Sequence, residues 1–377
     1  MKKKVLFTTN LPAPYSVEFF NNLAQFYDLT VIFERTNAAD RDKSWERYGA
    51  VQFEPIFLSG ILVGNEFAFC PSIVSYLREK KYDQIIIGDY SSPTGIYAIL
   101  FMHVCHMDFL IHADGGIIGA DSKSKYLLKK YLLSKAGGYM SPGDLTDKYF
   151  RYYGDKEKPI YRFPFTSVSK KDIVSTVLKK EEKKRLRKNL GMADTLADSY
   201  LVLSVGQIIP RNGNDILLNA AAKINKNIQI LIIGGKATEE LSNIINLRKL
   251  NNVYFMEFIP HGHVCEYMKA ADLFVLPTRY DIWGLVINEA MASGLPVITT
   301  TRCVSGMELV ENGKNGYVIE PENIEALSYT INVMAEMAPD MQYAMGQHSI
   351  LKIHEYTIEN MAVQYAKEVN NYIESRQ

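Results

Sequence analysis

Short apolar runs alternate along this chain with longer segments in which apolar residues recur at helical spacing. Each run is bounded by glycine, proline or polar residues, which is typical of a strand buried in a sheet. The expected strands are Val5–Thr9, Leu29–Phe33, Gln84–Gly88, Phe109–His112, Tyr139–Met140, Tyr200–Gly206, Ile228–Ile233, Val253–Phe255, Leu273–Leu276 and Val297–Thr299. Because strands alternate with helices, the pattern predicts an α/β fold with parallel, doubly wound sheets.

The alternation runs through the chain twice, which predicts two domains, and 377 residues are enough to give each its own core. We expect a first domain over residues 1–167, a crossing over 168–195, a second domain over 196–355 and a closing helix over 356–377. The crossing contains a run of mixed charges, Lys179–Lys188, which we interpret as a solvated helix.

Composition excludes several classes of protein. The net charge is zero, whereas a nucleic-acid binder is normally basic, so we expect no nucleic-acid partner. The four cysteines are scattered without a pairing pattern, which favours buried thiols in a reducing compartment. The apolar run near the N-terminus is too short for a signal peptide, and no stretch approaches the roughly 18 apolar residues of a membrane span. We therefore expect a cytoplasmic protein.

Charge is distributed unevenly between the two halves. Residues 1–195 hold 29 Lys and Arg against 22 Asp and Glu, and residues 196–377 hold 13 against 20, from the totals of 42 and 42. Such asymmetry indicates that the first half faces an anionic surface.

One segment of the first half, Ser122–Lys135, has the composition of a helix that lies in a membrane interface. Five lysines (Lys123, Lys125, Lys129, Lys130, Lys135) interleave with Tyr126, Leu127, Leu128, Tyr131, Leu132 and Leu133. Helical spacing places Leu128, Tyr131, Leu132 and Lys135 along one side, so we expect a peripheral contact with the inner membrane face. The alternative is an ordinary amphipathic helix with its leucines in the core.

The stretch that organises the second half starts with the strand Leu273–Leu276, which stops at Pro277. A polar and aromatic loop follows, Gly284 opens a helix, and Gly294 ends it. A strand therefore brings a loop and a helix N-terminus to the carboxyl edge of a sheet, which is where open α/β folds bind ligands.

Two carboxylates flank this turn, Asp281 in the loop and Glu289 inside the helix. Between them, the N–H groups of Gly284, Leu285 and Val286 have no intrahelical acceptor and suit a diphosphate. The two oxygens of Glu289 suit the neighbouring hydroxyls of a ribose, and Asp281 can reach hydroxyls beyond the phosphates. The pattern predicts a nucleotide-sugar site.

We expect no metal at this site, because the helix terminus itself can receive the diphosphate and no ligand cluster lies nearby. An Asp-x-Asp sequence at Asp40 and Asp42 is interpreted as solvated. His261 and His263 lack partnered Cys or Asp and are expected to face solvent.

The acid pair Asp281-x7-Glu289, followed by Ala-Met-Ala-Ser-Gly-Leu-Pro-Val-Ile, resembles the donor-site signature of the retaining GT-B glycosyltransferases of family 4. The first acid is usually Glu in that family and is Asp281 here. The resemblance implies a GT-B architecture of two Rossmann-like domains facing across a cleft. It also implies that the donor binds the second domain, the acceptor binds the first, and the closing helix packs back on the first. The alternative is an ordinary βαβ unit with solvated acids.

Further along the resemblance, the segment Val205–Asp215 departs from the family. The family typically carries Arg just after the first glycine, Gly206, and Lys just before the second, whereas Gln207 and Asn212 stand there. Arg211 is our candidate for the phosphate-binding cation, because a guanidinium grips phosphate oxygens in two places. Alternatively, Gly206 lies in a plain turn and Arg211 is a surface charge.

In the first half, His112-Ala-Asp-Gly-Gly follows an expected strand. The family commonly places a His in this region against the donor sugar, so the resemblance assigns that contact to His112 and a second one to Asp114. The alternative is that His112 caps the strand by hydrogen bonds.

The resemblance implies a retaining hexosyltransferase that moves a hexose from a nucleotide diphosphate sugar to a lipid-linked saccharide in cell-surface polysaccharide biosynthesis. It implies no metal and no cofactor besides that co-substrate. Asp281 and His112 would hold the sugar while Arg211 stabilises the charge that builds on the diphosphate. Gln207 and Asn212 leave open a catalytically weak or inactive partner subunit that binds nucleotide sugars. A sugar phosphorylase is less favoured, since no lysine suits pyridoxal phosphate.

Overall fold

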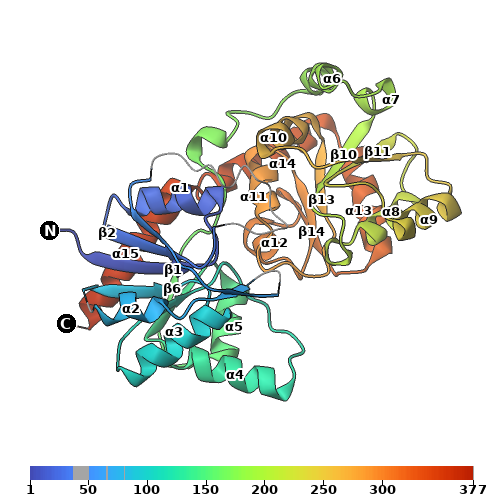
Figure 1. Cartoon of the computed structure of the whole chain (residues 1–377). Coiled ribbons are helices and arrows are strands. Elements are labelled where there is room, and N and C mark those ends of the chain that lie inside the picture. Colours follow the sequence, from blue (N-terminus) through green and yellow to red (C-terminus); the bar gives the residue numbers. More distant parts are fainter. Residues whose placement is uncertain (37–50, 65–66, 80, 377) are drawn as a thin grey trace. The chain divides into compact units, whose positions relative to one another are not determined.

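The computed structural model describes residues 1–36, 51–64, 67–79 and 81–376. The chain forms two compact units, one of Met1–Ser167 with Thr357–Gln377 and the other of Val168–Tyr356 (Figure 1). The segment 168–195, expected as a crossing, groups with the second unit, and the closing helix groups with the first.

The first unit is built on a seven-stranded parallel sheet in the order β3-β2-β1-β6-β7-β8-β9. Its strands are β1 Lys4–Thr9, β2 Asp28–Phe33, β3 Glu54–Phe57, β6 Gln84–Ile87, β7 Leu110–His112, β8 Gly138–Ser141 and β9 Ile160–Arg162. The strand order reverses between β1 and β6, which creates a crevice at their carboxyl ends.

Helices cover this sheet, and a small antiparallel hairpin stands apart from it. The helices are α1 Pro14–Leu23, α2 Ile73–Arg78, α3 Pro93–Val104, α4 Lys123–Leu133, α5 Asp144–Tyr153 and α15 Ile358–Ser375, and the hairpin is β4 Ile61–Val63 with β5 Phe67–Phe69. Helix α15 packs against α1, and its buried side chains complete the core of the first unit. The Tyr27 hydroxyl donates to the Ala366 carbonyl oxygen at 2.8 Å.

The second unit contains a six-stranded parallel sheet in the order β12-β11-β10-β13-β14-β15. Its strands are β10 Tyr200–Val205, β11 Ile228–Ile233, β12 Val253–Met256, β13 Leu273–Leu276, β14 Val297–Thr300 and β15 Gly316–Ile319. Its helices are α6 Lys180–Asn189, α7 Asp194–Ala197, α8 Asn214–Ala221, α9 Glu239–Arg248, α10 His261–Ala270, α11 Leu285–Ala292, α12 Val304–Leu309, α13 Ile324–Glu336 and α14 Pro339–Ile353.

Burial on both faces explains why the strands of the second unit are apolar throughout rather than alternating. Leu201 and Leu203 of β10 belong to the core on one face of the sheet, and Val202 belongs to the core on the other. The same division holds for Phe274 and Val275 of β13. The strand order again reverses between β10 and β13, so the carboxyl ends of these two strands border a crevice. The α/β prediction with doubly wound parallel sheets is confirmed.

The charged helix α6 is not simply solvated, and that interpretation is wrong for two of its residues. Lys183 and Arg187 are buried, and both reach the carboxylate of Asp272 just before β13, at 3.2 and 2.6 Å. The Arg187 Nε–H also donates to the Ala270 carbonyl oxygen at 2.7 Å. A buried charge needs such a partner, so these cations fix α6 to the sheet.

Helix α4 forms where the pattern predicts it, with Ser122 accepting from the Lys125 N–H as its cap. The expected apolar side of α4 is wrong for Leu132, because Leu132 and Leu133 are buried in the core of the first unit. Leu127, Leu128 and Tyr131 remain exposed. The buried leucines match the alternative of an ordinary amphipathic helix, and the membrane contact stays a prediction.

Candidate functional site

The start of helix α11 is fixed by a glycine in a left-handed conformation. Gly284 has φ 90°, and a Cβ there would come within 2.8 Å of the Cys303 Sγ. The Ser305 hydroxyl donates to the Gly284 carbonyl oxygen at 3.1 Å. Leu285 and Val286 form the first turn, whose N–H groups have no intrahelical acceptor. The three residues predicted to face a diphosphate thus form one helix terminus.

Asp281 is held in front of this terminus. Its backbone N–H donates to the Arg302 carbonyl oxygen at 2.8 Å, and its carboxylate accepts from the Trp283 N–H at 3.2 Å. Burial raises the pKa of Asp281, and the nearby Arg211 guanidinium opposes that rise. The Asp281 Oδ1 lies 3.7 Å from the Arg211 Nη1, so two predicted site residues that are far apart in sequence come together.

Arg211 lies in a single turn of 3-10 helix, Pro210–Asn212, between β10 and α8. Its carbonyl oxygen accepts from the Thr278 hydroxyl at 2.9 Å and from the Arg279 N–H at 2.8 Å. Its guanidinium lies 5.8 Å from the centre of the Tyr280 ring and is partly exposed. The turn is therefore fastened to the loop that follows β13, and its cation remains accessible.

Arg279 is a residue of this site that the sequence patterns missed. Its Nη1 and Nη2 donate to the two carboxylate oxygens of Asp215 at 2.9 and 2.7 Å, and its Nε donates to Glu322 at 2.9 Å. Hydrogen bonding to Asp215 raises the pKa of Arg279, and the same bond lowers the pKa of Asp215. Arg279 thus clamps the start of α8 to the β13 loop. No local pattern could have revealed it, because Asp215 lies 64 residues away.

Of the two positions where the family carries cations, the side chain of Asn212 has a structural role here. Gln207 is exposed, and Asn212 is buried and donates from Nδ2 to the Gln207 carbonyl oxygen at 2.8 Å. Gly206 has φ 152°, and a Cβ on Gly234 would lie 2.0 Å from the Gly206 carbonyl oxygen. The ends of β10 and β11 approach so closely that a side chain on Gly234 cannot fit.

Glu289 lies on α11 and is largely buried, and the structure gives it a partner. Its Oε1 lies 3.3 Å from the Nε2 of His261, the first residue of α10. Hydrogen bonding to Cys265 and to Glu289 raises the pKa of His261. His261 is 61% exposed and His263 is exposed as well, as expected, but His261 also pairs with Glu289 across two helices.

His112 and Asp114 belong to the first unit and contact each other. The buried His112 ring places Nε2 at 2.8 Å from the Asp114 Oδ1 and Nδ1 at 3.2 Å from the Tyr365 hydroxyl. The ring also stacks on Phe163 with centroids 5.0 Å apart. The Asp114 side chain is 45% exposed, so it is the more accessible member of the pair.

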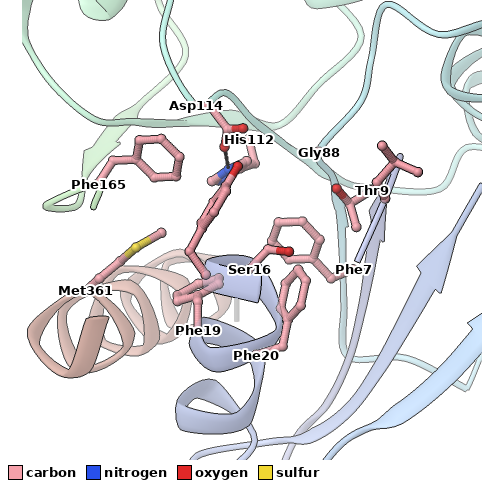
Figure 2. A pocket seen from close by; sticks show the side chains of 12 residues that line it. Phe7, Thr9, Ser16, Phe19, Phe20, Gly88, His112, Asp114, Phe165 and Met361 are labelled. Carbon is pink, nitrogen blue, oxygen red and sulfur yellow. Dashed lines mark hydrogen bonds and ion pairs between the residues drawn. The ribbon is translucent and has the colours of Figure 1, made fainter. Parts of the chain in front are cut away.

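These two residues border a small cavity of about 60 Å³ at the carboxyl end of β1 (Figure 2). Its wall consists mainly of aromatic and other apolar side chains, with a few polar groups. The lining residues are Phe7, Thr9, Leu11, Tyr15, Ser16, Phe19, Phe20, Gly88, His112, Asp114, Phe165 and Met361.

A buried carboxyl group lies at the end of β2 in the same unit. The Ser92 hydroxyl, which caps α3 by accepting from the Gly95 N–H, donates to the Glu34 Oε1 at 2.6 Å. Burial raises the pKa of Glu34 to about 8. Burial and the neighbouring Asp114 raise the pKa of Asp89 to about 6.

Within the described ranges, no three or more His, Cys, Asp and Glu side chains are grouped so that they could hold a metal ion. Asp40 and Asp42 lie outside those ranges. Among the described residues, no helix combines the length and apolar character needed to cross a membrane.

Solved structures share the fold of the whole chain. Sucrose-phosphate synthase from Thermosynechococcus elongatus is 18% identical with a TM-score of 0.78, covering 99% of this chain and 100% of that one. Anabaena HepE, solved in complex with UDP and glucose, is 18% identical with a TM-score of 0.75, covering 98% and 100%. The two parallel-sheet units therefore form a GT-B fold, as the resemblance implied.

Residues 183–349, which lie in the second unit, match the family described as glycosyl transferases group 1. An uncharacterized glycosyltransferase of Methanocaldococcus jannaschii is 26% identical over 76% of this chain and 74% of its own length. The D-inositol 3-phosphate glycosyltransferase of Mycolicibacterium smegmatis is 28% identical over 46% of this chain and 42% of its own length. The latter match thus spans less than half of that relative.

Proposed function

We propose that this protein transfers a hexose from a nucleotide diphosphate sugar to a saccharide acceptor with retention of anomeric configuration. The observation that carries the proposal is the cluster at the carboxyl edge of the second sheet. There the Arg211 guanidinium lies 3.7 Å from the Asp281 carboxylate, beside the glycine-fixed start of α11, and the same helix carries Glu289. A cation, a helix N-terminus and two carboxylates match the parts of a nucleotide sugar.

In this proposal the protein acts mainly by electrostatics. The bond between the anomeric carbon and the diphosphate oxygen breaks, and the electron pair leaves with the diphosphate. Arg211 and the N–H groups at the start of α11 stabilise the growing negative charge. The acceptor hydroxyl bonds to the anomeric carbon from the same face, and its proton passes to the departing diphosphate oxygen. No enzyme nucleophile takes part.

Other residues would position the substrate. Glu289 accepts hydrogen bonds from the ribose hydroxyls, and Asp281 accepts them from the transferred sugar. In the first unit, both ring nitrogens of His112 already have partners at 2.8 and 3.2 Å. The Asp114 side chain is the more exposed of the two, so we propose that Asp114 contacts the sugar and that His112 orients Asp114.

We propose that turnover needs neither a divalent metal nor a bound cofactor, because Arg211 and the start of α11 can supply the positive charge that the diphosphate requires. A uridine diphosphate hexose is the first donor to test, since HepE was solved with UDP and glucose.

For the acceptor we propose a lipid-linked saccharide of a cell-surface polysaccharide, reached through a peripheral contact with an anionic membrane. The lysine-rich exposed side of α4 supports that contact. Among the fold neighbours is WaaG, a glycosyltransferase involved in lipopolysaccharide biosynthesis, with a TM-score of 0.67 and 17% identity.

Two measurements test the proposal. A thermal-shift panel of UDP-, GDP- and ADP-sugars should reveal the donor, since a ligand that binds the folded state raises the melting temperature. Incubation with that donor and saccharide acceptors should then release free nucleoside diphosphate. Binding without release would instead favour the second candidate, an inactive nucleotide-sugar-binding subunit, which Gln207 and Asn212 suggest because the family's cations are missing there.

A further inference from the structure

Exposed apolar side chains gather on three neighbouring elements of the first unit, which we call the apolar face. Its members are Ile61, Leu62 and Val63 of β4, Tyr97, Leu100 and Val104 of α3, and Leu127, Leu128 and Tyr131 of α4. The three elements are linked by contacts. The Phe69 ring of β5 meets the Tyr97 ring at 5.6 Å, and the His103 ring of α3 meets the Tyr131 ring at 6.3 Å. Figure 1 shows α3 and α4 next to each other.

The edge strand β4 of this face is exposed, whereas its partner strand β5 packs on the first unit with Ala68 buried. Ile61 and Leu62 are 73% and 68% exposed, and Val63 is exposed as well. Successive side chains of a strand point to opposite sides, so neither side of β4 is covered by the described residues of the first unit. Val104, at the other end of α3, is 75% exposed. Isolated apolar residues on a surface are ordinary, but a set spread over three contacting elements indicates an interaction surface.

Positive charge accompanies the apolar face. Helix α4 and its cap end carry five lysines and no acid between residues 123 and 135. Two of these lysines are engaged locally, because Asp121 lies 3.1 Å from Lys125 and 2.7 Å from Lys129. Lys123 and Lys130 are exposed and lie outside this Asp121 cluster. The face therefore joins exposed apolar groups to a cationic helix.

We propose that the apolar face enters the headgroup layer of an anionic lipid membrane, with β4, α3 and α4 all in contact with lipid. The uncovered sides of β4 favour lipid over a protein partner, because a headgroup layer can surround an exposed edge strand whereas a flat protein surface covers one side. The lysines complement anionic headgroups and add electrostatic attraction. The inference rests on the proposed function in one respect: membrane docking would bring the proposed lipid-linked acceptor within reach of the protein.

Flotation of the full chain with phosphatidylcholine vesicles, with and without phosphatidylglycerol, tests this inference. We expect binding to the anionic vesicles at low salt. Leu62→Asp, Val104→Asp and Leu128→Asp place one charge in each element and should each weaken binding by about tenfold. Lys123→Glu and Lys130→Glu should each weaken it by about fivefold, with less effect at high salt. Lys125 and Lys129 are unsuitable for this purpose, since they hold Asp121.

Matched controls lie on the second unit. Leu247 and Leu351 are exposed there, and Lys226 is an exposed lysine, so Leu247→Asp, Leu351→Asp and Lys226→Glu make the same chemical changes elsewhere. Circular dichroism establishes that each variant is folded. Failure of the wild type to float, or wild-type binding by any of the three face variants, overturns the proposal.

Self-association that Val104→Asp abolishes, in a chain that does not bind vesicles, would assign the face to a second copy and also overturn it. A thermal shift with UDP, measured on the same preparations, separates this inference from the proposed function. Loss of flotation with the UDP shift intact contradicts the membrane face, whereas flotation without any nucleotide binding contradicts the donor site.

Discussion

A substitution at Glu289 tests the proposed donor site most directly. It is largely buried and paired with His261 at 3.3 Å, so its carboxylate is held in place before any ligand arrives. Glu289→Gln keeps the shape and removes a charge-assisted hydrogen bond to the ribose. We expect a loss of roughly 1.5–3 kcal/mol of donor binding, measured by calorimetry.

Two controls accompany that measurement. Glu240→Gln makes the same change on the exposed side of α9 and should leave affinity unchanged. The penalty of Glu289→Gln should shrink with a 2′-deoxy nucleotide, because one ribose hydroxyl is then missing. An equal penalty with both nucleotides would assign Glu289 to another part of the ligand.

Arg211 should act on the rate more than on the fold. Its guanidinium is partly exposed, and the turn that carries it is held through its backbone carbonyl oxygen. Arg211→Ala should therefore fold normally and lower kcat by about 10²–10³-fold, the range for removing a group that stabilises transition-state charge. Arg248→Ala, an exposed arginine of α9, is the control. If Arg211→Ala keeps a kcat within a few-fold of wild type, the N-terminus of α11 and not Arg211 stabilises the charge on the diphosphate.

At the scale of elements, the Ser92 cap of α3 donates to the Glu34 carboxyl group, which burial keeps protonated. The pKa of Glu34 is raised from 4.5 to about 8, so the protonated form is favoured in the folded state. A raised pKa contributes stability that is fully present below about pH 4.5 and is lost as the pH rises through 8. Wild-type stability should thus fall across this window, by on the order of 5 kcal/mol.

Glu34→Gln removes that titration and should be more stable than wild type above pH 8, measured by urea unfolding between pH 5 and 9. Asp89 also titrates nearby, with a pKa of about 6, and Arg35 faces both acids, so a weaker pH dependence should remain in the variant. Parallel pH profiles for variant and wild type would show that Glu34 is already ionised at neutral pH.

Elements with strong local signals were predictable from sequence. The strand Leu273–Leu276 has the predicted bounds, and Gly284 and Gly294 bracket α11 as their turn chemistry requires. The donor-site residues of the second unit could be named because they lie in and around that one βα turn. The topology places the loops that carry Arg211 and Asp281 near each other, because β10 and β13 are neighbouring strands. It does not by itself predict that the two side chains pair.

Long-range polar contacts escaped prediction for a common reason. Arg279 with Asp215, His261 with Glu289, and Arg187 with Asp272 each join residues from different elements. Hydrophobic periodicity reports which side of an element is buried, but it carries no information on which charged groups meet across elements.

At the scale of the whole molecule, the chain returns to its first unit through α15 after completing the second. This helix buries eight residues. Its Tyr365 hydroxyl, near the middle, lies 3.2 Å from the His112 Nδ1, and its Tyr372 hydroxyl, near the C-terminal end, donates to Asp108 at 2.7 Å. Burial of that many side chains contributes on the order of 10 kcal/mol, which is as much as a typical domain's entire stability of about 5–15 kcal/mol.

Deletion of residues 357–377 should therefore unfold the first unit and leave the second folded, because the second unit is continuous from Val168 to Tyr356. Hydrogen exchange should show full deuteration over β1 and β2 and unchanged protection over β10 and β13. The truncated chain should still bind UDP, since Arg211, Asp281 and Glu289 all lie in the second unit, yet it should release no nucleoside diphosphate from a donor and acceptor. Protection of β1 at the wild-type level would contradict the role given to α15. Loss of UDP binding with β10 still protected would instead show that the first unit supplies part of the nucleotide site.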